Sequence, residues 1–161
     1  MDNVEKYIEL FLNMKRAPIR GYKAPHKPIL LLAIIELIER KSIISNRIVL
    51  DKTLIQEFTN KWYELIDDNT QQNQMVVAES LVIDVSYKCP FKCSIENPFF
   101  YLNSEPFWRL VPSEQYIKKN SYSCKGLQTS FKYAEIDKDL FNCLYNESER
   151  KLIKNVLMDM I

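Results

Sequence analysis

The chain has 161 residues, enough for one domain of ordinary size, and its 47% hydrophobic and 27% charged residues are typical of a folded globular protein. With 2 glycines and 1 histidine, it lacks the residues for a glycine-rich phosphate loop and for any site that needs two histidines, such as an HNH nuclease centre. The net charge of +1 indicates no particular class of partner.

The first part of the sequence predicts two helices joined by a basic loop. Apolar residues at helical spacing predict an amphipathic helix over residues 2–14. Three prolines and a glycine predict a loop over residues 15–28. Pro28 suits the first position of a second helix over residues 28–40, because that position does not use its backbone N–H. This helix is apolar on nearly all sides, so we expect it to be the buried centre of the fold.

The middle of the sequence predicts a short strand and a third helix. A β-branched segment predicts a strand over residues 47–50. Asp51 is a suitable N-cap for a helix over residues 52–66. Residues 67–74 are polar and predict a loop. The segment after that loop fits either a helix or a strand, and a strand over residues 81–87 is favoured.

Aromatic residues dominate the segment that follows. Residues 99–102 and 107–110 flank a four-residue turn, which predicts an antiparallel hairpin. Residues 113–130 are polar and basic and predict a loop, with Gly126 near its tip.

Two more helices are expected at the C-terminal end of the sequence. Asp137 would cap a helix over residues 138–145, and Ser148 would cap one over residues 149–160. The order of elements predicts one α+β domain over residues 1–161, mainly helical with a small antiparallel sheet, and winged-helix-like. The inward residues of the last helix would be Leu152, Ile153, Val156, Leu157 and Met160.

The charges are distributed unevenly along the chain. Residues 1–27 carry six basic and three acidic side chains, and residues 106–134 carry five basic and one acidic. If the fold brings these two segments together, they form a surface that attracts a polyanion. The alternative is a chance clustering of solvated lysines.

We expect no cofactor, no metal site and no catalytic group. The acidic N-terminus is unlike a signal peptide, and the longest apolar stretch, residues 29–35, is too short to span a bilayer, so a cytoplasmic protein with reduced thiols and no membrane partner is expected. The spacing of Cys89 and Cys93 is not typical of a zinc site. The Glu-x-Lys sequence at Glu149–Lys151 falls in a predicted amphipathic helix and is not expected to catalyse a reaction.

The basic loop before the second predicted helix is the first candidate binding site. No acidic residue occurs between Glu9 and Glu36. Backbone N–H groups at a helix N-terminus bind anions when cations lie nearby, so we expect a phosphate to bind here. In the alternative interpretation, the histidine is a hydrogen-bonded polar cap and the lysines are solvated. The candidate residues are Arg20, Lys23, His26 and Lys27.

The second candidate lies around Pro98. At strand spacing, Phe99 and Tyr101 share one face, while Phe100 and Leu102 share the other. A proline ring with aromatic edges forms an apolar concavity that offers few hydrogen-bond donors. The alternative is that these aromatic residues are simply part of the core.

Several segments together resemble a known family. They are Ala24-Pro-His-Lys-Pro-Ile-Leu-Leu-Leu32, then Asn46-Arg-Ile with Leu50, Leu54 and Phe58, then Asn97-Pro-Phe-Phe-Tyr-Leu-x4-Phe107-Trp-x-Leu110, and Asp139-Leu-Phe-x2-Leu144. Over most of its length the chain resembles the sulfur-binding domain that precedes an HNH nuclease in type IV restriction enzymes against phosphorothioate-modified DNA. The resemblance implies a domain that reads phosphorothioate-modified double-stranded DNA, and an HNH nuclease that is fused to it or associated with it.

The resemblance also implies roles for individual residues. His26 and Lys27 would contact the DNA backbone near the modified phosphate, and Pro98 would line an apolar cavity for the sulfur atom. The chain departs from the family where it has Asn97 in place of a usual tyrosine and Tyr101 in place of a small residue. The cavity residues would be Asn97, Pro98, Phe99 and Tyr101. Further DNA contacts would come from Lys118, Lys119, Ser123 and Lys125.

Two other functions stay open at this point. The chain could be a winged-helix reader of another DNA modification or of a plain base sequence. It could also be a protein-interaction module whose aromatic hairpin docks onto a partner. The DNA-binding functions predict binding to DNA of any base sequence at low salt, whereas the protein-interaction module predicts none.

Overall fold

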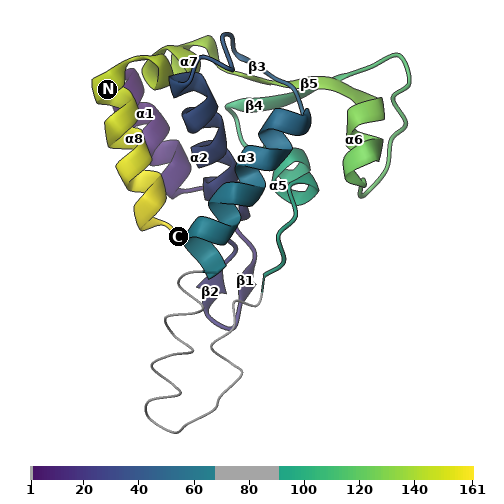
Figure 1. Cartoon of the computed structure of the whole chain (residues 1–161), viewed down its shortest axis with the longest axis horizontal. Helices are drawn as coiled ribbons and strands as arrows, with labels where there is room; N and C mark the ends of the chain where they lie inside the picture. The colour runs from purple at the N-terminus through teal and green to yellow at the C-terminus, as the bar shows by residue number, and fades with distance from the viewer. Residues whose placement is uncertain (1, 68–90) are drawn as a thin grey trace, which may run out of the picture.

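The chain folds around its most apolar helix (Figure 1). The computed structural model describes residues 2–67 and 91–161. Its helices are α1 (Asn3–Leu12), α2 (His26–Glu39), α3 (Lys52–Trp62), α5 (Glu96–Tyr101), α6 (Cys124–Ser130), α7 (Lys138–Tyr145) and α8 (Glu147–Asp159). A π-helical turn, η1 (Tyr63–Asp67), and a 3₁₀ turn, η3 (Leu102–Ser104), extend α3 and α5. Its strands are β1 (Pro18–Ile19), β2 (Tyr22–Lys23), β3 (Arg47–Ile48), β4 (Trp108–Pro112) and β5 (Phe131–Ile136).

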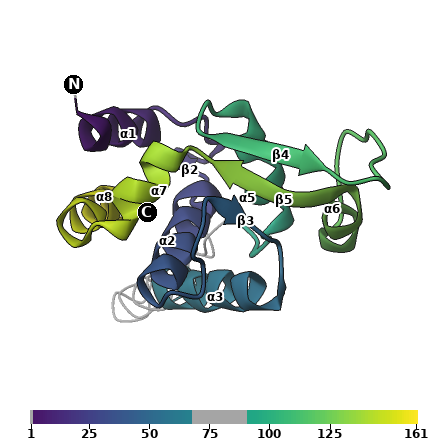
Figure 2. The ribbon, with the colours of Figure 1, turned by 90° about the horizontal axis from the view of Figure 1, so that it is seen from above.

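Helix α2 is the centre of the core, as its composition predicts. It packs against α3, α5, α7 and α8, and Figure 2 shows α1, α7 and α8 on one side of it and the sheet on the other. Side chains all round the helix are buried, among them Ile29, Leu30 and Ile34. Burying each such side chain contributes roughly 1.5–3 kcal/mol. The helix begins at His26 rather than at Pro28, so Pro28 is its third residue.

Helices and a small antiparallel sheet together confirm the α+β class. In the sheet the strand order is β3-β5-β4, and all its pairs are antiparallel. The three strands meet around Ala134, which is opposite Ile48 on one side and Leu110 on the other. A second, two-stranded sheet, β1-β2, is a separate hairpin that precedes α2.

The predicted hairpin of residues 99–102 and 107–110 is wrong. Residues 96–101 form helix α5, and Pro98 lies in its first turn, where a proline is well tolerated. The aromatic runs touch through side chains instead: the Trp108 indole N–H donates to the Phe99 carbonyl at 3.1 Å, and the two rings meet edge to face. The true partner of β4 is β5, which follows the predicted loop 113–130; that loop itself contains α6.

The helix ends show which capping predictions were right. Asp51 caps α3, since its carboxylate accepts the Leu54 N–H at 2.9 Å. Asn146, and not Ser148, caps α8 by accepting the Glu149 N–H at 3.0 Å. Asp137 stands at the N-cap position of α7, but its side chain makes no cap hydrogen bond.

Asp137 instead connects distant elements. Its carboxylate accepts hydrogen bonds from the Tyr7 hydroxyl of α1 and from an Arg109 N–H of β4, each at 2.8 Å.

On α8, Ile153 and Leu157 are buried as predicted, whereas Leu152 is 53% exposed and does not face the core. The predicted strand at 81–87 and nearly all of the predicted loop at 67–74 lie outside the described residues. Within the described ranges, no helix has the length and apolar character of a membrane span.

Candidate functional site

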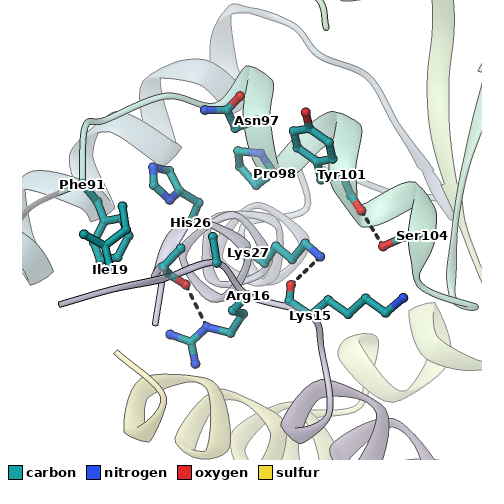
Figure 3. Close-up of a pocket in the computed structure, with 12 residues that line it drawn as sticks. Lys15, Arg16, Ile19, His26, Lys27, Phe91, Asn97, Pro98, Tyr101 and Ser104 are labelled. Carbon is teal, nitrogen blue, oxygen red and sulfur yellow. Dashed lines mark hydrogen bonds between the residues drawn. The ribbon is translucent and has the colours of Figure 1, made fainter. Parts of the chain in front are cut away.

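A pocket of about 670 Å³ lies between the β1–β2 hairpin and helix α5, at the N-terminal end of α2 (Figure 3). It brings together the two segments that the sequence singled out, the basic loop before α2 and the residues around Pro98. Much of its wall is apolar, contributed by alanines, aromatic rings, a proline and Ile19. The lining residues are Lys15, Arg16, Ala17, Ile19, Ala24, His26, Lys27, Phe91, Asn97, Pro98, Tyr101 and Ser104.

Helix α5 supplies one wall of the pocket. Pro98 and Tyr101 are three residues apart, so a helix puts them on the same face, whereas a strand would put them on opposite faces. Pro98 is buried and Tyr101 is 51% exposed at the rim. Asn97 also lines the pocket. The sequence therefore indicated the right segment, but its predicted secondary structure was wrong.

Phe99 does not line this pocket. It is 1% exposed and packs edge to face on Trp108, with 5.4 Å between the ring centroids. Its prediction as a cavity residue assumed strand spacing, which pairs residue 99 with residue 101. Helical spacing instead turns Phe99 into the core, so the alternative of a core aromatic is right for this one residue.

His26 is held rigidly as the first residue of α2. Its Nε2 lies 2.7 Å from the carbonyl oxygen of Lys92, and because a carbonyl can only accept, this nitrogen carries the hydrogen. The imidazole also contacts the Trp62 ring at 4.7 Å and the edge of Phe91 at 5.9 Å. Burial lowers the pKa of His26, with the Lys92 carbonyl and Glu96 opposing that shift. The ring is therefore a neutral, packed element of the pocket near pH 7.

The lowered pKa of His26 predicts a pH dependence of stability. The unfolded chain, with the ordinary value of 6.5, takes up the proton before the folded chain does. Stability is therefore complete above about pH 6.5 and falls as the pH decreases below it. Urea unfolding at pH 5.5 and 7.5 should show this loss, and His26→Gln should reduce it. Equal losses in both proteins would contradict the assignment.

The Lys27 side chain makes its contacts with other groups of the protein rather than with solvent. Its Nζ donates to the Lys15 carbonyl at 2.7 Å and lies 3.9 Å from a carboxylate oxygen of Glu105. The same Glu105 oxygen accepts the Lys15 N–H at 3.0 Å. Both charged side chains are about nine-tenths buried, and burial lowers the pKa of Lys27 while Glu105 opposes that effect. The Lys27 ammonium is directed at groups of the protein, and its contact with a phosphate stays a prediction.

Arg16 is a pocket residue whose function the sequence did not reveal. Its guanidinium donates to the Ala24 carbonyl and to the Met160 carbonyl, both at 2.8 Å, and more weakly to the Lys23 carbonyl at 3.4 Å. It thereby ties the β1–β2 hairpin to the end of α8. Burial lowers the pKa of Arg16. Its partners lie 8 and 144 positions away, a relation that no local pattern encodes.

The β1–β2 hairpin presents the remaining predicted cations of this segment. Arg20 and Gly21 form its two-residue turn with φ values of 53° and 82°, the positive-φ geometry that matches strand twist in tight hairpins. Arg20 and Lys23 are exposed and do not line the pocket, while Ile19 of the same hairpin does. The sequence predicted a loop here and missed the turn because arginine is an unusual residue at positive φ.

The second basic segment lies on the α6 side of α5, away from the pocket wall. Lys118, Lys119 and Lys125 are exposed, and no ion pair joins them to another residue of the described ranges. Ser123 caps α6, because its hydroxyl oxygen accepts the Gly126 N–H at 3.0 Å. Gly126 therefore lies in the first turn of a helix and not at a loop tip. The structure thus brings the two basic segments to either side of α5 rather than into one pocket.

Neither the described residues nor the comparisons with known proteins add an indication of what the pocket binds. Among residues 2–67 and 91–161, no three His, Cys, Asp or Glu side chains are grouped so that they could hold a metal ion. Glu149 and Lys151 lie on α8, as the sequence predicts. No family model matches the chain, and no curated protein matches it either.

Proposed function

We propose that this domain binds double-stranded DNA and recognises a phosphorothioate linkage, without carrying out a reaction itself. The observation that supports this most strongly is the pocket, in which Pro98, Tyr101 and Ile19 form an apolar wall. The exposed Lys15 lies in its lining, and the exposed Arg20 and Lys23 lie on the adjoining hairpin. In a restriction system, cleavage would then be the task of a fused or associated HNH nuclease.

The proposal follows from how sulfur differs from oxygen. A sulfur atom in a non-bridging position is larger, more weakly hydrated and a poorer hydrogen-bond acceptor than oxygen, so it enters an apolar pocket at little cost. An ordinary phosphate oxygen would lose its hydrogen bonds to water there, a penalty of roughly 1–3 kcal/mol. That penalty corresponds to a preference of about tenfold to a hundredfold.

Affinity, in contrast to preference, would come from cations that neutralise phosphates. Arg20 and Lys23 on the hairpin and Lys118 and Lys119 beyond α5 are exposed. Each phosphate neutralised releases counterions, so binding should weaken steeply as salt rises. The buried pair of Lys27 and Glu105 would stabilise the segments that line the pocket and would not contact DNA.

The decisive experiment compares one duplex with and without a single Rp phosphorothioate at moderate salt. Tighter binding of the modified duplex supports the proposal, and equal affinities overturn the recognition of sulfur. Absence of binding to either duplex at low salt overturns DNA binding altogether and favours the protein-interaction module.

Arg20→Asn is expected to stabilise the domain and at the same time to weaken its binding to DNA. Asparagine tolerates positive φ better than arginine, so the free energy of unfolding should rise by about 0.5–1 kcal/mol. The missing charge should weaken binding of modified and unmodified duplexes equally and reduce the salt slope by about 0.9. Thermal unfolding and anisotropy titrations measure the two effects. A change in the sulfur preference itself would contradict this role.

The size of the pocket favours a second candidate function. A volume of about 670 Å³ is far more than one sulfur atom fills and lies in the range of pockets for whole small molecules. The domain would then be a winged-helix-like reader of a bulkier DNA modification, with β4 and β5 as the wing. Selection from libraries of modified and unmodified duplexes distinguishes this function from recognition of sulfur.

A further inference from the structure

One side chain holds the second basic segment in its conformation. The Tyr122 hydroxyl donates to the Ile117 carbonyl at 2.6 Å and accepts the Lys119 N–H at 3.0 Å. These two hydrogen bonds close the chain between residues 117 and 122 into a compact loop. Lys118 and Lys119 lie within the closed loop, and both are exposed.

The ring of Tyr122 fixes this loop to the body of the domain. It contacts the Phe131 ring at 5.4 Å and the Phe100 ring at 5.1 Å. Phe100 in turn contacts Tyr101 at 5.1 Å, and Tyr101 is a rim residue of the pocket. A continuous row of aromatic rings therefore runs from the pocket to the loop of residues 117–122 that carries Lys118 and Lys119.

The first turn of α6 packs closely against the same tyrosine. A Cβ atom added at Gly126 would lie 3.7 Å from a ring carbon of Tyr122 and 3.2 Å from the Ser123 hydroxyl oxygen. Tyr122 is only partly exposed as a result. Both its ring and its hydroxyl thus make contacts within the protein.

From these contacts we infer that Tyr122 is a positioning residue. It sets Lys118 and Lys119 at a fixed place relative to the pocket, so that one duplex contacts the pocket and these two lysines together. The inference rests on the proposed function, since it names how the second phosphate contact is made. A loop already ordered before binding loses less conformational freedom when it meets DNA, and this gain appears as affinity. The hydroxyl supplies that order, because its two hydrogen bonds are the ones that link the ends of the loop among the described residues.

Tyr122→Phe tests the inference because it removes the hydroxyl and keeps the ring. We expect binding of modified and unmodified duplexes to weaken by the same factor, roughly two- to tenfold. The slope of log affinity against log salt should become shallower by about 0.9 for each phosphate that the loop no longer neutralises. The ratio of the two affinities should not change. A merely structural role for Tyr122 would leave the salt slope as it is.

The residue just before the loop offers a matched control, Tyr116→Phe. Tyr116 is exposed and contacts the Phe131 ring at 5.5 Å, but its hydroxyl makes no hydrogen bond with another described residue. This variant should retain the slope of the wild-type protein. In a chain that already carries Lys118→Ala and Lys119→Ala, Tyr122→Phe should have no further effect on affinity.

Hydrogen exchange provides a readout that does not depend on DNA. The Lys119 amide should exchange faster in Tyr122→Phe than in the wild-type protein, while amides of α2 should be unaffected. An unchanged salt slope together with faster exchange overturns the inference but leaves the proposed function intact. A wild-type protein that shows no salt-dependent DNA binding overturns both.

Discussion

Replacing Lys27 with methionine is expected to lower the free energy of unfolding by about 3 kcal/mol. Methionine fills most of the space of the lysine stem but leaves the carboxylate of Glu105 buried without its cation. The Lys15 carbonyl also loses its donor. Urea denaturation at pH 7 measures the loss, and the midpoint should fall while the m-value stays constant.

A second substitution shows whether the ion pair itself is the cause. Glu105→Gln keeps an oxygen that can accept the Lys15 N–H and removes the negative charge. The double variant Lys27→Met/Glu105→Gln should therefore recover a large part of the stability, and the double-mutant cycle should give a coupling energy of roughly 0.5–3 kcal/mol. A stable Lys27→Met protein that binds both duplexes more weakly would instead support the contact with phosphate that the sequence predicted.

Lys27 illustrates why the sequence could identify the basic loop but not the function of each cation. The absence of acidic residues between Glu9 and Glu36 is a local property, and it is correct. The neutralising carboxylate comes from Glu105, whose bond to Lys15 spans 90 positions. A lysine with a distant partner and a lysine facing solvent look identical in the sequence.

The same limit explains the error at residues 99–102. A run of aromatic residues has a high strand propensity, and propensity is readily overridden by tertiary contacts. Here Pro98 in the first turn and the bond from Trp108 to the Phe99 carbonyl favour the helix. The apolar patterning of α1 and α3 was sufficient because each buries a face with helical periodicity, and α2 could be recognised because it is apolar on nearly all sides.

Pro98→Ser is expected to remove most of the preference for the phosphorothioate duplex. The proline ring forms part of the apolar wall, and a serine would place a hydroxyl there that can donate a hydrogen bond to an ordinary phosphate oxygen. The preference should fall from about tenfold to a hundredfold to less than about threefold. Binding of the unmodified duplex should stay the same or become slightly tighter.

The substitution should leave the fold intact. Residue 98 lies in the first turn of α5, where the backbone N–H has no partner within the helix, so regaining it costs little. Pro106→Ser is the matched control, because Pro106 is exposed in the connection before β4 and does not line the pocket. It should leave the preference unchanged.

Anisotropy titrations of the paired duplexes at two salt concentrations measure the effect without interference from overall affinity. Salt weakens the binding of both duplexes through the same phosphate contacts. The ratio of their affinities should therefore be nearly independent of salt in the wild-type protein. Pro98→Ser should change this ratio and leave the salt slope alone, while Arg20→Asn should do the opposite. If Pro98→Ser retains the full preference, the sulfur atom does not enter the pocket beside α5, since a donor in that wall would otherwise relieve the penalty on oxygen.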